Sequence, residues 1–392
     1  MDQPSRADRL VVVVSDVEIG AGGVTDDFPQ SEFLGQVLLK TRQDTDLPID
    51  FVFNGDTFDF LKTRVSGRWP LQITADLAVA KLVNIMRAHE AFFDALHTLA
   101  SSAETRLHFV VGNHDPELVF EQVQRVLRRR LGGSLESINF PGFIWRFGDL
   151  HVEHGSQADP LFRVDPSKPF GTHRGRPMLA LPWGSVAILE VAMPMQPVLY
   201  HFDRVKPRDV LVAQVPELQE LLTGLYYQYW KEHGAGWLLG DDQLKRLSWS
   251  AFKEIVYRFG TRDLKVSFGD HFCKLVEGDG RIKVAIGGHT HSPSVWTKAD
   301  RRVLTTGCWR NEFVMEGDRF ESLPRVHAHV WMEGERSLHA TLVEHAAPPL
   351  PKGYVPPVHK QLPKLRELLA DGDLEGVERA WTRQETLDKT LG

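Results

Sequence analysis

The chain has 392 residues and a net charge of −6, and its 42% hydrophobic and 25% charged residues are typical of a globular protein. The negative charge disfavours a protein that depends on attraction to duplex nucleic acid, and no run of about 18 apolar residues predicts a membrane span. The two cysteines, Cys273 and Cys308, and an N-terminus without a signal pattern predict a reducing, cytoplasmic location.

The first part of the chain alternates short apolar runs with helical patterns. The apolar runs that predict strands are Val11–Val14, Phe51–Phe53, Phe109–Val111 and Leu150–Val152, and Val284–Ile286 follows much later. Apolar residues at helical spacing predict one helix over Gln72–Leu99 and another over Leu118–Leu131, where three arginines form a solvated helix end. This alternation predicts an α/β protein.

Each of the five apolar runs leads directly into a segment that carries metal-binding side chains. The segments are Ser15-Asp16-Val17-Glu18, Gly55-Asp56-Thr57-Phe58-Asp59, Gly112-Asn113-His114-Asp115, Glu153-His154-Gly155 and Gly288-His289-Thr290-His291. Strands that end at one edge of a sheet direct such side chains to one place. Carboxylates, an amide and imidazoles suit a pair of divalent ions, so the sequence predicts a two-metal site.

The order and spelling of these segments resemble the calcineurin-like metallophosphoesterase superfamily, whose usual string is DxH, GDxxD, GNHD, a His before Gly, and GHxH. Four of the five segments match, and the first departs because Glu18 stands where the family has His. The resemblance implies a four-layer α/β/β/α sandwich of two mixed sheets. It also implies a metal-dependent phosphoric ester hydrolase with two divalent ions, Mn²⁺ first and Fe, Zn²⁺ or Mg²⁺ as alternatives, in which a metal-activated hydroxide attacks the substrate.

The resemblance also implies a role for each matching side chain. The expected metal ligands are Asp16, Glu18 and His291 at one site, Asn113, His154 and His289 at the other, and Asp56 as the bridge. His114 would contact the substrate phosphate or protonate the leaving group, and Asp59 would hold its ring. Asp115 is expected to cap the helix that starts near Pro116.

Glu18 adds one negative charge to the usual ligand set. A less positive centre predicts weaker binding of a phosphate dianion and a better fit to a diester or pyrophosphate linkage. It also favours one trivalent iron, or harder ions such as Mn²⁺ over Zn²⁺. The alternative is that Glu18 replaces the histidine as an oxygen ligand with little further change.

From Ala158 to His271 the ligand motifs stop, and helices are predicted over 185–200, 215–230 and 241–259. We therefore expect a catalytic core of residues 1–157 and 272–346, a helical cap insertion of residues 158–271, and a Pro-rich linker with a helical tail over 347–392. The insertion resembles the helical lid of UDP-2,3-diacylglucosamine hydrolases, which cleave a nucleotide–lipid pyrophosphate. The alternative is a helical buttress without substrate contact.

Three further strands are predicted after the insertion, over 303–306, 326–332 and 338–343. In the second of them, His327 and His329 alternate with apolar residues and are interpreted as outward polar positions rather than metal ligands. The tail is expected to pack on the core or on another subunit.

Cationic side chains near the insertion are candidates for phosphate contacts: Arg163, Arg174 and Arg310. The apolar residues between Leu179 and Phe202 form a core of the cap, cover an acyl chain or rest on a membrane surface. The predicted function is hydrolysis of a phosphate ester, phosphodiester or pyrophosphate in a small nucleotide or lipid-linked substrate. The alternatives are a nuclease or cyclic-nucleotide phosphodiesterase, and an inactive scaffold with this fold that binds other proteins.

Overall fold

A computed structural model of the chain describes residues 3–23, 26–173, 175–193, 204–206, 247–261, 269–316 and 319–349, with single positions between 227 and 236. The chain forms two compact units. The first comprises Met1–Ser185, Leu247–Arg310 and Pro324–Ala346, and the second comprises Val186–Arg246, Asn311–Leu323 and Ala347–Gly392. All the strand-end segments with predicted metal ligands lie in the first unit.

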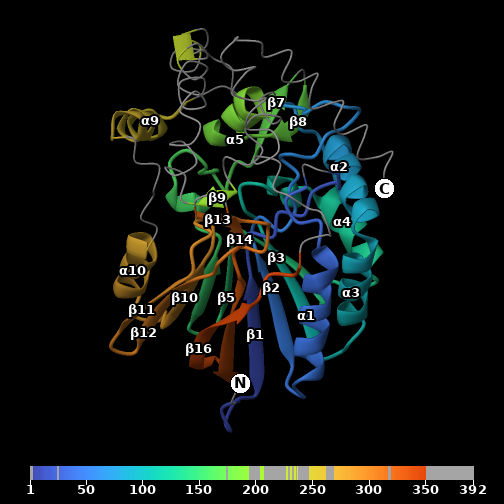
Figure 1. Ribbon diagram of the computed structural model, residues 1–392, viewed down its shortest axis with the longest axis vertical. Coiled ribbons are helices and arrows are strands. Elements are labelled where there is room, and N and C mark those ends of the chain that lie inside the picture. Colours follow the sequence, from blue (N-terminus) through green and yellow to red (C-terminus); the bar gives the residue numbers. More distant parts are fainter. Residues whose placement is uncertain are drawn as a thin grey trace. The chain divides into compact units, whose positions relative to one another are not determined.

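The first unit contains a six-stranded mixed sheet with the order β16-β15-β1-β2-β3-β4 (Figure 1). Its strands are β1 (Arg9–Val14), β2 (Ile49–Asn54), β3 (Thr105–Val110), β4 (Ile138–Gly142), β15 (Arg325–Glu333) and β16 (Arg336–His345). Strands β1 to β4 are parallel, and β15 pairs antiparallel with both β1 and β16. The run Leu10–Val14 is continuously apolar because both faces of a central parallel strand are covered.

A second mixed sheet in the same unit has five strands in the order β11-β12-β10-β6-β5. Its strands are β5 (Ile144–Phe147), β6 (Leu150–Glu153), β10 (Val284–Gly287), β11 (Ser294–Lys298) and β12 (Arg301–Thr305). Strand β10 pairs parallel with β6 and β12, whereas β5 and β11 are antiparallel edge strands. The sequence prediction of two mixed sheets is confirmed.

The two sheets pack face to face over one apolar core. Val13 of β1 and Val330 of β15 lie in the same buried cluster as Val152 of β6, Ile286 of β10 and Leu304 of β12. All five side chains are almost completely inaccessible to solvent. This burial is the main favourable term that holds the two sheets together.

Helices cover the outer faces of both sheets (Figure 1). Four of them lie beside the first sheet: α1 (Ser31–Gln43), α2 (Ala75–Ala88), α3 (Glu90–Ala100) and α4 (Glu121–Leu131). Phe92 of α3 meets Phe53 of β2 edge to face, with 6.4 Å between ring centroids. On the second sheet, Phe272 of α10 (Gly269–Gly278) packs with Ala285 of β10 and Val303 of β12. The layers are therefore helix, sheet, sheet and helix, which confirms the expected four-layer sandwich.

The single helix predicted over Gln72–Leu99 is wrong, because α2 ends at Ala88 and α3 begins at Glu90. His89 stands at the break and is buried. Its Nε2 lies 2.7 Å from Asp26 Oδ2, and its Nδ1 lies 2.7 Å from Ser31 Oγ. These partners are distant in sequence, so local helical periodicity could not reveal the break.

The helix predicted over Leu118–Leu131 is also interrupted. A 3₁₀ turn, η1, covers Pro116–Val119, and the α-helix α4 begins only at Glu121. Phe120 between them has an extended backbone, with φ −76° and ψ 123°. At the other end, the expected arginine run does face outward in part, since Arg130 pairs with the exposed Asp94 at 2.6 Å.

His327 and His329 are not solvent-facing positions, which corrects the sequence interpretation. Their side chains point away from the core between the sheets, but both residues are buried. Their Nε2 atoms lie 2.9 Å apart, and their ring centroids lie 4.8 Å apart. His327 also stacks on His345, with 5.1 Å between the two ring centroids. Trp309 covers the same group, since its ring centroid lies 5.8 Å from that of His327.

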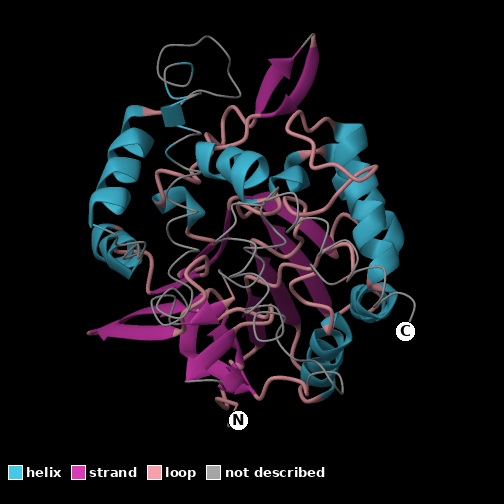
Figure 2. Cartoon of the chain, turned by 45° about the horizontal axis from the view of Figure 1, so that its top comes forward, coloured by secondary structure: helices cyan, strands magenta, loops and turns pink. Residues whose placement is uncertain are grey.

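In the predicted cap region, the structure describes a hairpin of β7 (Phe170–His173) and β8 (Arg176–Leu179), the short helix α5 (Trp183–Ala187), the π-helical turn η3 (Ile188–Ala192) and α9 (Trp249–Thr261) (Figure 2). The hairpin and α9 belong to the first unit. The second unit includes a small sheet of β14 (Arg319–Ser322), β13 (Phe313–Glu316) and β9 (Val205–Lys206).

The predicted helix over 215–230 lies outside the described residues except for positions 227 and 230. The tail helices, almost all of the Pro-rich linker and the end of the helix predicted over 185–200 also lie outside them. None of the helices in the described part of the chain has the length and apolar character needed to cross a membrane.

Candidate metal centre

The predicted ligands follow the carboxyl ends of five strands. Asp16, Asp56 and Asn113 come after the parallel neighbours β1, β2 and β3, and His154 and His289 come after the parallel neighbours β6 and β10. In open α/β sheets, the carboxyl ends of parallel strands are where loops form a ligand site. The structure places these loops together at one edge of the sandwich.

The backbone is strained at these same positions. Seven non-glycine residues in the described part of the chain have a positive φ, and five of them are the predicted ligands Asp16, Glu18, Asp56, His289 and His291, with φ from 50° to 66°. A non-glycine residue in this region costs about 1–3 kcal/mol and persists where the surrounding structure imposes it. The strain therefore marks the segments that the sequence assigns to metal binding.

Two glycines allow ligand carboxylates to approach the neighbouring loops. A Cβ atom on Gly112 would lie 2.1 Å from Asp56 Oδ1, and one on Gly288 would lie 2.5 Å from Asp16 Oδ2. Any side chain at either position would displace a carboxylate. The glycines of the GNHD and GHTH segments are thus explained by close packing at the site.

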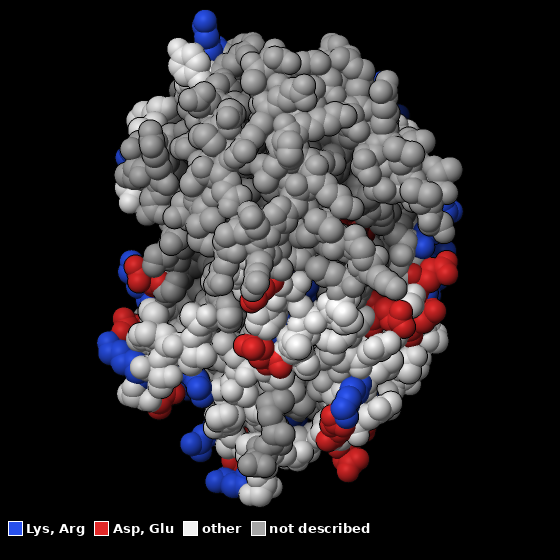
Figure 3. Space-filling view, in the orientation of Figure 1, with Lys and Arg blue, Asp and Glu red and all other residues white. Residues whose placement is uncertain are grey.

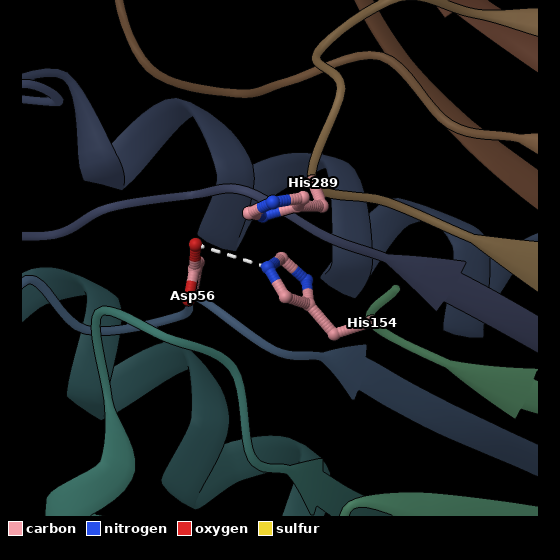
Figure 4. Close-up of side chains that lie close together, drawn as sticks. All are labelled: Asp56, His154 and His289. Carbon is pink, nitrogen blue, oxygen red and sulfur yellow. Dashed lines mark ion pairs between the residues drawn. The ribbon is translucent and has the colours of Figure 1, made fainter. Parts of the chain in front are cut away.

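One group of predicted ligands gathers around His154, which is almost completely buried. Its Nε2 lies 3.0 Å from Asp56 Oδ2 and 3.2 Å from Asn113 Oδ1. Its Nδ1 donates a hydrogen bond to the carbonyl oxygen of Asn54 at 3.0 Å, which fixes the ring and leaves Nε2 for a ligand. The ring of His289 is 5.2 Å from that of His154 and steeply inclined to it (Figure 4). Asp56, His154 and His289 have ligand atoms within 4.8 Å of one another.

A second group consists of Asp16, Glu18 and His291. The Nε2 atom of His291 lies 3.2 Å from Asp16 Oδ1 and 3.5 Å from Glu18 Oε1. Glu18 Oε1 is buried and accepts no hydrogen bond from the residues that the structure describes. A buried carboxylate oxygen without a donor is costly, and a bound cation removes that cost. The donor set of both groups therefore fits divalent metal ions.

The other oxygen of Glu18 is held by two cations that the sequence analysis did not connect with it. Lys62 Nζ and Arg310 Nη1 each lie 3.0 Å from Glu18 Oε2. Both cations also pair with Asp27, which is itself buried. Burial alone would raise the pKa of Glu18, but Arg310, Lys62 and His114 together hold it well below its usual value.

His114 lies beside this second group, and its Nδ1 is 3.9 Å from Glu18 Oε2. Its Nδ1 is 3.1 Å from Asp59 Oδ1, and its main-chain N–H donates to Asp56 Oδ1 at 2.7 Å. Burial by itself would lower the pKa of His114, but the charges of Glu18, Asp56 and Asp59 raise it to about 9. The three carboxylates therefore favour the protonated form of the ring.

Asp115 does not cap the helix at Pro116, which corrects the prediction. Its Oδ1 accepts a hydrogen bond from the Gly112 N–H at 2.7 Å, and its Oδ2 accepts one from the Thr57 N–H at 2.8 Å. The carboxyl group therefore ties the loop after β3 to the loop after β2. Burial, with a contribution from Asp56, raises the pKa of Asp115 to about 7.

The three arginines proposed for substrate contacts have different surroundings. Arg163 is exposed, and its Nε donates to the carbonyl oxygen of Gln157 at 2.8 Å. Arg310 is buried against Glu18 and Asp27. Arg174 lies outside the described residues.

No family model and no curated sequence matches this chain. Similar solved structures include a dimetal phosphatase from Danio rerio, which is 10% identical with a TM-score of 0.31 and is covered over 87% of this chain and 100% of its own. A phosphopantetheinyl hydrolase from Mycobacterium tuberculosis is 12% identical with a TM-score of 0.26, over 77% of this chain and 91% of its own. A Staphylococcus aureus protein described as a 5′-nucleotidase is 12% identical with a TM-score of 0.31, over 93% of this chain and 58% of its own. This chain therefore spans less than two thirds of that last protein.

The strand-end motifs lie on the strands of the two-sheet sandwich. The chain resembles the calcineurin-like metallophosphoesterase superfamily. Its main departure from the superfamily pattern is Glu18. In the structure, Lys62 and Arg310 form ion pairs with this residue.

Proposed function

We propose that the protein is a metal-dependent phosphoesterase that hydrolyses a phosphate ester, phosphodiester or pyrophosphate bond, with Mn²⁺ as the first candidate for both ions. The observation that carries the proposal is that predicted ligands from separate strand ends come together, several of them with a strained backbone. In addition, the buried Oε1 atom of Glu18 accepts no hydrogen bond from the described residues. In this proposal Asp16, Glu18 and His291 hold one ion, Asn113, His154 and His289 hold the other, and Asp56 holds both.

Two bound divalent ions would lower the pKa of a coordinated water and neutralise charge on the phosphate. The chain itself supplies the proton that the leaving oxygen needs. The Nδ1 atom of His114 faces Asp59, which leaves Nε2 as the atom that donates this proton. Asp59 orients the ring and stabilises its protonated form, and the main-chain N–H of His114 fixes Asp56 in return.

The same proposal assigns the substrate to small molecules with an apolar or aromatic group, such as a nucleotide or a lipid-linked phosphate. A half-open pocket of about 460 Å³ lies in the first unit, and Val111, Leu118, Phe140 and Phe143 are among its mostly apolar lining residues. None of the predicted metal ligands lines it, but Val111 and Leu118 stand on either side of Asn113 and His114 in the chain. In this proposal the pocket takes the non-reacting part of the substrate. On the face in Figure 3, acidic and basic side chains of the described residues lie among one another. The net charge of −6 disfavours duplex DNA as the substrate.

The test is hydrolysis by the full-length protein with Mn²⁺, Mg²⁺ and Zn²⁺ in turn. The substrates are p-nitrophenyl phosphate, bis(p-nitrophenyl) phosphate, a nucleoside diphosphate linked to an apolar alcohol, and single-stranded DNA. We expect turnover of a small substrate that disappears with Asp56→Asn. Preferential cleavage of single-stranded DNA would favour a nuclease. No turnover and no bound metal would favour a scaffold that binds other proteins.

A further inference from the structure

The surroundings of Glu18 are specific to this chain. Glu18 carries a negative charge where the superfamily pattern has a neutral histidine, and its two oxygens face different partners. Oε1 lies toward His291 and receives no hydrogen bond from the described part of the chain. Oε2 lies 3.0 Å from both Lys62 Nζ and Arg310 Nη1.

These two cations are built into the site. The side chain of Lys62 is 12% exposed and that of Arg310 is 4% exposed, so neither is a solvated surface charge. Lys62 Nζ also lies 3.4 Å from Asp59 Oδ2 and pairs with Asp27, and Arg310 Nη1 lies 3.6 Å from Asp27 Oδ2. Buried cations of this kind are stable only when carboxylates pair with them.

We propose that Lys62 and Arg310 are positioning residues for Glu18: they hold its Oε2 and leave Oε1 as the metal ligand. The proposal rests on the proposed metal centre and deepens it. The positive charges of Lys62 and Arg310 lie against the negative charge that Glu18 adds to the ligand set. They therefore oppose the less positive centre expected from the ligands alone.

The arrangement also links the metal ligand to the proton donor. Lys62 contacts Glu18 with its ammonium group, and its main-chain N–H donates to Asp59 Oδ1 at 3.0 Å. Asp59 Oδ1 is the same atom that faces His114 Nδ1. Lys62 therefore fixes both the carboxylate that binds metal and the carboxylate that orients the imidazole.

A double-mutant cycle on metal affinity tests the proposal. Mn²⁺ binding to demetallated full-length protein would be measured by calorimetry, with the metal content checked by mass spectrometry. Loss of a group that orients a metal ligand typically weakens metal affinity about 10–100-fold. We expect Lys62→Met to weaken one of the two Mn²⁺ sites by that factor, and to cause no further loss in the Glu18→His background. Arg310→Lys, which keeps the charge but not the geometry, should give a smaller loss.

The control is Lys40→Met, because Lys40 forms an exposed ion pair with Asp44 far from any predicted ligand in sequence. The absorption spectrum of the Co²⁺-loaded protein should change with Lys62→Met and not with Lys40→Met, since it reports the ligand field rather than overall stability. Equal Mn²⁺ affinity in Lys62→Met and wild type, or the same loss with and without Glu18, would overturn the proposal.

If Lys62→Met does not fold, Lys62→Gln takes its place with the same expectation. Failure of both to fold would overturn the positioning role and make Lys62 a structural residue. Metal binding by the wild-type protein distinguishes a failure of the proposed function from a failure of the role proposed for Lys62. If it binds no divalent ion, the proposed function fails, whereas two bound ions with unchanged affinity in the Lys62 variants contradict only the role of Lys62.

Discussion

The ligand group around His154 and the group around Glu18 occupy the same edge of the sandwich, but their surroundings differ. His154 is fixed by a neutral carbonyl oxygen, that of Asn54, and its partners are other ligands. Glu18 is fixed by the two buried cations Lys62 and Arg310. A motif therefore predicts a ligand that a main-chain carbonyl oxygen supports, but it does not predict the charges gathered around a substituted ligand.

Asp56 belongs to both groups, so its replacement should have the largest effect. Its Oδ2 faces His154, and its Oδ1 receives the main-chain N–H of His114. Asp56→Asn removes the only carboxylate proposed to hold both ions, and we expect hydrolysis to fall to background and both Mn²⁺ sites to weaken. Activity and Mn²⁺ stoichiometry measured together check this. Loss of only one ion would show that Asp56 does not bridge.

His114 distinguishes chemistry from metal binding on the Glu18 side. A general acid typically contributes about 10²–10⁴ in rate, so His114→Gln should lower kcat by that factor while both ions still bind. Steady-state kinetics with an alkyl phosphate diester, whose leaving oxygen needs a proton, and metal analysis give the two readouts. His97→Gln, at an exposed position on α3, is the matched control. A substrate with a very acidic leaving group should reduce the effect, and an equal loss on every substrate would contradict a proton donor.

The two groups should also differ in stability when metal is absent. Glu18→Gln leaves Lys62 and Arg310 paired with fewer carboxylates, and breaking a buried ion pair costs about 3–5 kcal/mol. Asn113→Ala removes one buried hydrogen-bonding partner of His154, which costs about 1–3 kcal/mol. Urea unfolding of the two demetallated variants compares these losses. Equal losses would mean that the cations around Glu18 find other partners.

Sequence patterns predict that the candidate ligands lie close together because each follows an apolar strand, which fixes its position. Asp16, Asp56 and His289 could be predicted in this way. The role of Lys62 could not, because its contacts with Glu18 and Asp27 depend on how separate segments of the chain pack together. The one local hint is that Lys62 follows Phe60 and Leu61, which places a charge in a buried apolar run.

The same reason explains the errors in the fold. The break between α2 and α3 depends on the contacts of His89 with Asp26 and Ser31. In β15, apolar and polar residues alternate as in a strand with one solvent-exposed face, although both faces of this strand are buried. Periodicity reports which residues share a face, but it does not report what packs against that face.

His329 should make the free energy of unfolding sensitive to acid independently of the two ligand groups. It lies outside the ligand set, and burial and the neighbouring His345 lower its pKa to about 4. The unfolded chain, with a pKa near 6.5, binds more protons between these values, so the free energy of unfolding should fall by about 3 kcal/mol as pH drops from about 6.5 to 4. Urea unfolding across this range measures the slope. It should flatten in His329→Gln but not in the control His339→Gln, which changes an exposed histidine of β16. An unchanged slope in His329→Gln would assign the acid sensitivity to other groups, first to the neighbouring His327, whose pKa burial and His329 hold well below its usual value.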